Sequence, residues 1–155
     1  MIWEEMKESL IFLNLEDAYS GEVLKTVGTA LIREGYAKST YVNGLIEREK
    51  KFPTGLNIGG IGIAIPHTEA CYVEKDGMAL AVLKTPVKFF QMGTDDENID
   101  VRLVFMLAIK DPDKHLKRLQ RILDLIQDSS VLEQLLDAKD EKTIIRIIRK
   151  KEEAL

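Results

Sequence analysis

His67 is the residue in this sequence that is best placed to do chemistry. It is one of two histidines in 155 residues and ends a run of glycines and small apolar residues, GGIGIAIPHTEA (residues 59–70). Pro66 immediately before it fixes one backbone torsion and removes a backbone donor. A rigid turn with little surrounding bulk favours an accessible, reactive imidazole. The alternative is a histidine that caps a strand end or fills a hydrogen-bonding role.

Two further side chains, those of Arg48 and His115, could bind an anion. Arg48 lies near the end of a helical segment, LIEREK, and an arginine fork binds phosphoryl oxygens in a bidentate way. Its alternative role is a solvated charge paired with Glu47, Glu49 or another acid, and such surface pairs are weak. His115 follows KDPDK and is expected in the first turn of a helix, where backbone N–H groups favour an anion. It could donate to a phosphoryl oxygen there, or be an ordinary surface histidine.

Other catalytic and binding chemistries find no support in the sequence. The two histidines and the single cysteine lack the spacing of a zinc site, and there is no GxxxxGK[ST] phosphate loop. The glycines at 59, 60 and 62 do not fit the dinucleotide pattern GxGxxG. Cys71 is interpreted as a buried thiol rather than a nucleophile. No metal or organic cofactor is expected, and one acidic cluster is interpreted as a solvated loop: Asp95, Asp96, Glu97 and Asp100.

Composition indicates one globular domain. The chain is 45% hydrophobic and 31% charged, which is normal for a protein that buries a sizeable core. Its 22 basic and 26 acidic residues give a net charge of −4, which argues against nucleic acid as the main ligand. With one cysteine, no internal disulfide is possible.

The N-terminal sequence MIWEEMKESL has acids where a signal peptide needs basic residues, and no apolar run is long enough to span a membrane. A cytoplasmic location is therefore expected, with any membrane connection made through a partner.

The hydrophobic pattern mixes strands and helices. Strands are expected at residues 10–15, 61–65, 78–85 and 101–110, with a further short strand at 88–91 and an acidic loop at 93–100. Helices are expected from Ser20 to a stop at Gly35, from Ser39 or Thr40 to about residue 50, and from Asp113 onward. Ser129 or Ser130 is expected to cap the next helix, and Asp140 the last one. This mixture predicts an α/β domain with helices packed on a sheet.

Taken together, these residues resemble the enzyme IIA domains of the fructose–mannitol class in the bacterial sugar phosphotransferase system. The match rests on GIAIPHTE, on LIEREK before it and on DKHLKRLQRI after it, and it extends from about residue 10 to 149. The run from VKFFQMGTDDENID to LDLIQD is most similar to the galactitol-type subfamily. The resemblance implies a mixed sheet flanked by helices and a single enzyme IIA-like domain over residues 1–155.

The resemblance also implies roles. His67 would accept a phosphoryl group on Nε2 from the phosphocarrier HPr and pass it to a cognate enzyme IIB, with membrane enzyme IIC involved only indirectly. Arg48 would bind phosphoryl oxygens, and His115 would be the second ring of the site. The basic residues after His115 have no assigned role: Lys117, Arg118 and Arg121. An apolar rim with Ile63 and Ile65 would serve both partners.

Two other functions compete with phosphoryl transfer in sugar uptake. The same fold could be a regulatory module that binds a transporter, kinase or transcription factor and signals by phosphorylation. A chain of a different class would be a small hydrolase that uses His67 and Glu69 as an acid–base pair. Phosphoryl transfer is preferred because it explains Arg48, His67 and His115 together.

Overall fold

The computed structural model describes residues 1–113 and 116–155. Its five strands are β1 (Ile11–Leu15), β2 (Gly55–Ile58), β3 (Ile61–Ala64), β4 (Gly77–Phe90) and β5 (Asn98–Ala108). Its α-helices are α1 (Ile2–Glu5), α2 (Ser20–Arg33), α3 (Tyr41–Lys51), α4 (Leu116–Ile126), α5 (Ser129–Asp137) and α6 (Glu141–Ala154). Two short 3-10 turns, η1 (Glu8–Leu10) and η2 (Ala70–Tyr72), complete the described elements.

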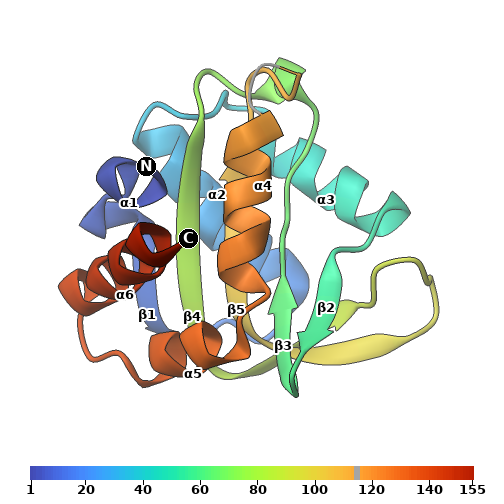
Figure 1. Ribbon diagram of the computed structural model, residues 1–155. Coiled ribbons are helices and arrows are strands. Elements are labelled where there is room, and N and C mark those ends of the chain that lie inside the picture. Colours follow the sequence, from blue (N-terminus) through green and yellow to red (C-terminus); the bar gives the residue numbers. More distant parts are fainter. Residues whose placement is uncertain (114–115) are drawn as a thin grey trace.

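The strands form one mixed sheet in the order β1-β4-β5-β3-β2. β1 pairs with β4 and β3 with β5 in parallel, whereas β4 pairs with β5 and β2 with β3 antiparallel. Helices cover both faces: α1, α4, α5 and α6 lie on the near face in Figure 1, and α2 and α3 lie behind the sheet. This arrangement confirms the expected α/β domain with a mixed sheet flanked by helices.

The two faces of the central strands pack against two separate hydrophobic cores. Along β4, Ala79, Ala81 and Leu83 pack toward α2 and α3, whereas Leu80 and Val82 pack toward the other helices. Strand side chains alternate between faces, so a continuous apolar run is the pattern expected when both faces are covered. The sheet is therefore a rigid middle layer from which loops project.

The expected elements are largely confirmed, with differences at their ends. Gly35 has φ 84° and ends α2, and the Asp140 carboxylate accepts from the Thr143 amide at the start of α6. The cap of α5 was wrongly expected at Ser129 or Ser130. Asp128 fills that role, because its side chain accepts from the backbone N–H groups of both Ser130 and Val131.

The hairpin of β4 and β5 is longer than the sequence indicated. Instead of a separate strand at residues 88–91, β4 continues to Phe90, and β5 begins at Asn98 within the expected acidic loop. Val87 and Phe89 are buried and pair with Val101 and Ile99, which extends the ladder after a register shift. The four-residue α1 and strand β2 were not anticipated. Both are too short for a periodic pattern to stand out.

Candidate functional site

His67 lies in the loop that follows β3, where the chain leaves the sheet beside β5. The carbonyl oxygen of Pro66 accepts a 3.0 Å hydrogen bond from the Leu107 amide, which ties this loop to β5. The Leu107 carbonyl in turn accepts from the buried Tyr41 hydroxyl at 2.8 Å. The loop is therefore fixed to the sheet and to α3, and His67 is presented from a rigid base.

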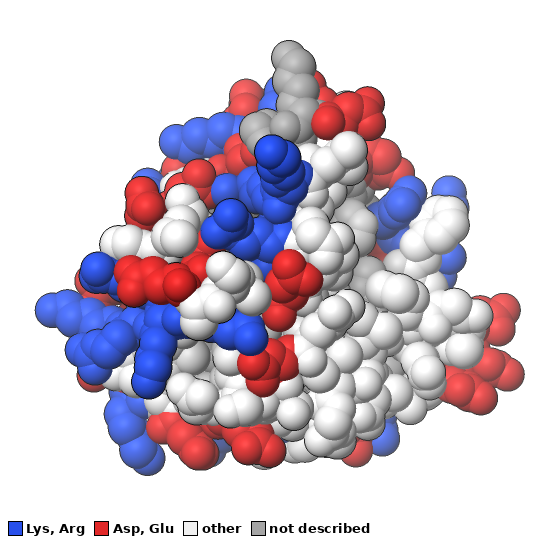
Figure 2. Space-filling view, in the orientation of Figure 1, with Lys and Arg blue, Asp and Glu red and all other residues white. Residues whose placement is uncertain are grey.

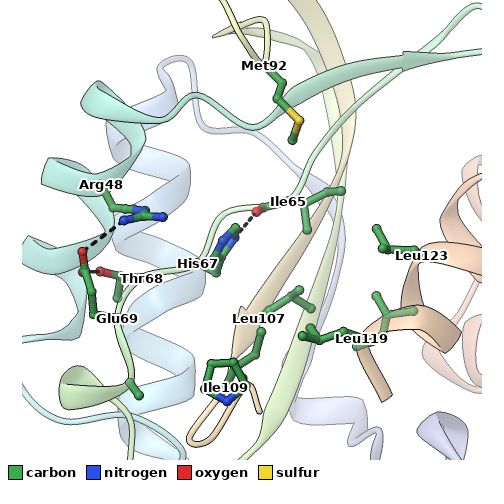
Figure 3. Close-up of a pocket in the computed structure, with 13 residues that line it drawn as sticks. Arg48, Ile65, His67, Thr68, Glu69, Met92, Leu107, Ile109, Leu119 and Leu123 are labelled. Atoms are coloured by element: carbon green, nitrogen blue, oxygen red, sulfur yellow. Dashed lines mark hydrogen bonds and ion pairs between the residues drawn. The ribbon is translucent and has the colours of Figure 1, made fainter. Parts of the chain in front are cut away.

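The His67 ring is oriented by its own backbone. Nδ1 lies 2.9 Å from the carbonyl oxygen of Ile65 (Figure 3). A carbonyl oxygen can only accept, so this hydrogen bond requires the proton of a neutral ring to be on Nδ1. The lone pair is then on Nε2. The geometry selects one nucleophilic nitrogen of the half-buried ring.

Arg48 projects from the last turn of α3 into the same pocket. Its Nη1 lies 3.3 Å from Oε1 of Glu69, and its guanidinium stacks on the Phe52 ring at 4.2 Å from the centroid. The paired Arg48 and Glu69 side chains are 34% and 54% exposed, which makes this a weak, exchangeable ion pair. The alternative partners on α3 are engaged elsewhere: Glu47 pairs with Lys50, and Glu49 binds Thr54.

Glu69 is held in its ionised form. The Thr68 hydroxyl donates to the carboxylate at 2.6 Å, and this bond, with a smaller contribution from Arg48, lowers the pKa of Glu69. A carboxyl group with a depressed pKa is a poor proton donor near neutral pH. This environment does not favour the acid–base role that a hydrolase would require of Glu69.

A pocket of about 410 Å³ brings His67 and Arg48 together under α4. Leu119 and Leu123 of α4 form one wall, opposite Arg48, and Met92 from the β4–β5 hairpin closes one end (Figure 3). The other lining residues are mostly apolar: Ile65, Thr68, Glu69, Ala70, Leu107, Ile109, Pro112 and Ile122. Ile65 thus belongs to the apolar rim as expected, whereas Ile63 is fully buried in the core and does not.

Charge is distributed unevenly around this pocket. Figure 2 shows Lys and Arg side chains gathered over α4 and α6, and a largely uncharged surface beside α4. Two of the basic residues without an assigned role are structural, since Arg118 pairs with Glu5 of α1 and Arg121 lies 3.7 Å from Glu152 of α6. They join α4 to its neighbouring helices.

His115, the other expected ring of the site, lies outside the described residues. The remaining predictions can be compared directly. Cys71 was expected to be buried and is exposed, because η2 carries it outward from the loop after His67. The expected solvated character of the acidic segment is confirmed, since all four acids are exposed: Asp95, Asp96, Glu97 and Asp100. Asp100 is in β5 instead of a loop and pairs with Lys88 at 2.8 Å.

The part of the chain that the structure describes offers neither a metal site nor a membrane-spanning helix. No group of three or more His, Cys, Asp or Glu side chains is arranged to hold a metal ion. No described helix is long and apolar enough to cross a membrane. Three side chains that contact other members of the site were given no role from the sequence: Thr54, Phe52 and Thr68, the last of which lies within GIAIPHTE.

Comparison with known proteins places this geometry in a family. Residues 4–151 match the domain described as phosphoenolpyruvate-dependent sugar phosphotransferase system, EIIA 2. The galactitol-specific EIIA component of Escherichia coli is 33% identical over 115 residues, which cover 74% of this chain and 76% of that protein. The transcriptional regulator ManR of Bacillus subtilis is 35% identical over 105 residues, 68% of this chain but 15% of the regulator.

A solved structure gives the same result for the fold. Enzyme IIA of the mannitol system of Escherichia coli, in complex with phosphorylated enzyme IIB, has a TM-score of 0.77 to this chain at 24% identity. The similarity covers 94% of this chain and 97% of that one. The chain therefore belongs to the EIIA type 2 family of the phosphoenolpyruvate-dependent sugar phosphotransferase system.

Proposed function

We propose that this protein is a phosphocarrier that accepts a phosphoryl group on Nε2 of His67 and passes it on. The supporting observation is the hydrogen bond from Nδ1 to the Ile65 carbonyl, which leaves the lone pair on Nε2 in a pocket shared with Arg48. Family membership supplies the reaction class. HPr is the proposed donor, and a cognate enzyme IIB is the proposed receiver.

The transfer needs positioning and charge rather than a cofactor. As the Nε2 lone pair attacks phosphorus, the bond from phosphorus to the donor nucleophile breaks, and charge spreads over the three equatorial oxygens. Arg48 is placed to exchange its weak contact with Glu69 for these oxygens, because a charge-assisted bidentate contact is the stronger one. The mostly apolar wall offers water few hydrogen-bonding partners, so we expect it to slow hydrolysis of a phosphohistidine. His115 is proposed as a second ring at the site.

The sugar and the receiver are proposed from relatives. Similarity to the galactitol-specific EIIA component favours galactitol uptake. The fold shared with the IIA partner of the mannitol complex favours an enzyme IIB as receiver. A regulatory module is the second candidate, since part of ManR is similar to this chain.

The test is to incubate the purified chain with phosphoenolpyruvate, enzyme I and HPr and to follow its intact mass. We expect one acid-labile phosphoryl group on the wild type and none on His67→Ala with an unchanged circular dichroism spectrum. Full labelling of His67→Ala would refute the acceptor assignment. Onward transfer to a galactitol enzyme IIB separates the uptake role from the regulatory one, which predicts labelling without onward transfer.

A further inference from the structure

Ile65, the residue whose carbonyl orients His67, is itself held at its amide by a side chain from outside the loop. The β2–β3 ladder ends at the pair Gly55 and Ala64, so the next amide, that of Ile65, has left the ladder. This amide donates instead to the side-chain hydroxyl of Thr54, at 3.1 Å. The hydroxyl thus replaces a backbone partner at the point where the strand turns toward His67.

The Thr54 hydroxyl is in turn oriented by Glu49. Its oxygen lies 2.9 Å and 3.1 Å from the two carboxylate oxygens of Glu49, and the Thr54 amide donates to Oε1 at 3.0 Å. A hydroxyl has one proton, and that proton goes to the carboxylate. The lone pairs of the oxygen then face the Ile65 amide. Thr54 is 3% exposed, so water does not replace these contacts readily.

Glu49 is a partly buried carboxylate in the last turn of α3. Burial raises its pKa, and the hydrogen bonds from Thr54 offset part of that effect. A half-buried carboxylate is costly unless its acceptors are used. Here they are used by Thr54, and through it Glu49 is connected to the residue whose carbonyl binds the His67 ring.

We propose that Glu49 and Thr54 are positioning residues for phosphoryl transfer: they hold the amide of Ile65 and thereby fix the backbone of this residue, so that its carbonyl keeps His67 in the Nδ1-protonated form. This inference rests on the proposed role of His67. The brace, defined as Glu49, Thr54 and the backbone of Ile65, joins α3 to the loop. Glu49 and Thr54 act on the ring through the backbone of Ile65, and neither of these two side chains lines the pocket.

The brace also couples the Arg48 and His67 side chains of the site. Arg48 and Glu49 are neighbours in the last turn of α3, so the helix that presents the guanidinium also anchors the loop that presents the imidazole. A shift of about 1 Å in such geometry slows a transfer reaction by up to roughly a hundredfold. Loss of the brace should therefore impair transfer without removing any group that contacts the substrate.

The first test is direct and independent of phosphorylation. Two-dimensional ¹⁵N–¹H spectra of the imidazole report which ring nitrogen carries the proton. In the wild type and in Thr54→Ser, which keeps the hydroxyl, we expect His67 with its proton on Nδ1. In Thr54→Val, which keeps the shape but lacks the hydroxyl, we expect a mixture of the two tautomers. An unchanged Nδ1-protonated ring in folded Thr54→Val would overturn the proposal.

The second test is kinetic and uses matched acids on one helix. Glu49→Ala should slow phosphoryl acceptance from phosphorylated HPr by about tenfold or more, and Glu47→Ala, an exposed neighbour, should leave it unchanged. Thr54→Ser should be as fast as the wild type. If Glu49→Ala and Thr54→Val only lower the melting temperature and accept phosphate at the normal rate, the brace is structural and the proposal fails.

The two proposals fail in different ways. If His67→Ala is labelled like the wild type, the function proposed for His67 is wrong whatever the ring spectra show. If His67 is the acceptor but its tautomer and rate do not respond to Thr54→Val, only the brace is refuted.

Discussion

The guanidinium of Arg48 and the carboxylate of Glu69 lie 3.3 Å apart in the wall of the pocket that holds His67. The pair joins the end of α3 to the loop after β3, and both side chains are accessible to solvent. An anion that enters the pocket therefore competes with Glu69 for Arg48. The Glu69 carboxylate therefore occupies the anion-binding position of Arg48 when no other anion is bound.

Removing Arg48 should slow phosphoryl transfer. Hydrogen bonds to charged groups contribute about 1.5–3 kcal/mol, so we expect Arg48→Ala to lower the rate of acceptance about 10- to 100-fold. Rapid-quench kinetics with phosphorylated HPr measure this rate. Arg33→Ala, in the corresponding last turn of α2 and away from the pocket, is the control and should transfer normally. Normal kinetics for Arg48→Ala would assign Arg48 to the surface instead.

Neutralising Glu69 should favour phosphorylation of this protein, in contrast to the loss of Arg48. Glu69→Gln removes the competitor for Arg48 and a negative charge near the phosphoryl oxygens, so the phosphorylated form becomes more favourable. We expect the equilibrium with phosphorylated HPr to shift toward this protein by about two- to fivefold, a small change because the pair is exposed. Phosphorus NMR of the equilibrated mixture gives the ratio, with Glu74→Gln as control. A loss of labelling would instead favour an acid–base role for Glu69.

Glu152 should contribute to folding stability out of proportion to its place near the end of α6. It is 1% exposed and accepts from the amides of Ile2 and Trp3 at 3.0 Å and 2.7 Å. Glu152→Ala leaves both amides without their acceptor, and we expect the free energy of unfolding to fall by about 2 kcal/mol or more. That predicts a melting temperature about 4–8 °C lower. Its exposed neighbour variant, Glu153→Ala, should change stability by less than about 0.5 kcal/mol.

The glycine at the start of GIAIPH is required by the sheet. A Cβ at Gly62 would lie 1.8 Å from the carbonyl oxygen of Asp100 in the adjacent strand β5. Gly62→Ala must therefore push β3 away from β5, and we expect a loss of about 3 kcal/mol or failure to fold. Gly21→Ala, in α2 with open space around the added carbon, should stabilise the protein by about 0.5–1 kcal/mol. Urea denaturation of both variants compares them; equal stabilities would contradict the steric argument.

The members of the candidate site that could be proposed from the sequence are those with a local signature. His67 was identifiable because Pro66 and the small residues around it are adjacent in the chain, and the 2-residue alternation that ends in β3 marks the strand before it. Arg48 was identifiable as the end of a periodic helix. Each of these depends on neighbours within a few positions.

Relationships across the fold were not predictable in the same way. The hydroxyl of Thr54 binds the Ile65 amide only because β2 and β3 form a hairpin. Strand β2 is too short to be recognised from its sequence pattern. Cys71 is apolar enough to suggest burial, but the turn η2 carries it outward. Leu119 and Leu123 were expected on a helix, but only tertiary packing places them opposite Arg48.

The contact between Glu152 and the first residues joins positions 150 apart in the chain. A ribosome adds about 5–20 residues per second, so Glu152 is synthesised roughly 8–30 s after the Ile2 and Trp3 amides that it binds. Strand β1 waits as well, since its partner β4 is the third strand to follow it. During synthesis the N-terminal segment is thus an unpaired, partly apolar stretch. Strand β1 can pair once β4 has been made, whereas Ile2 and Trp3 gain their carboxylate partner only when the last helix has been made.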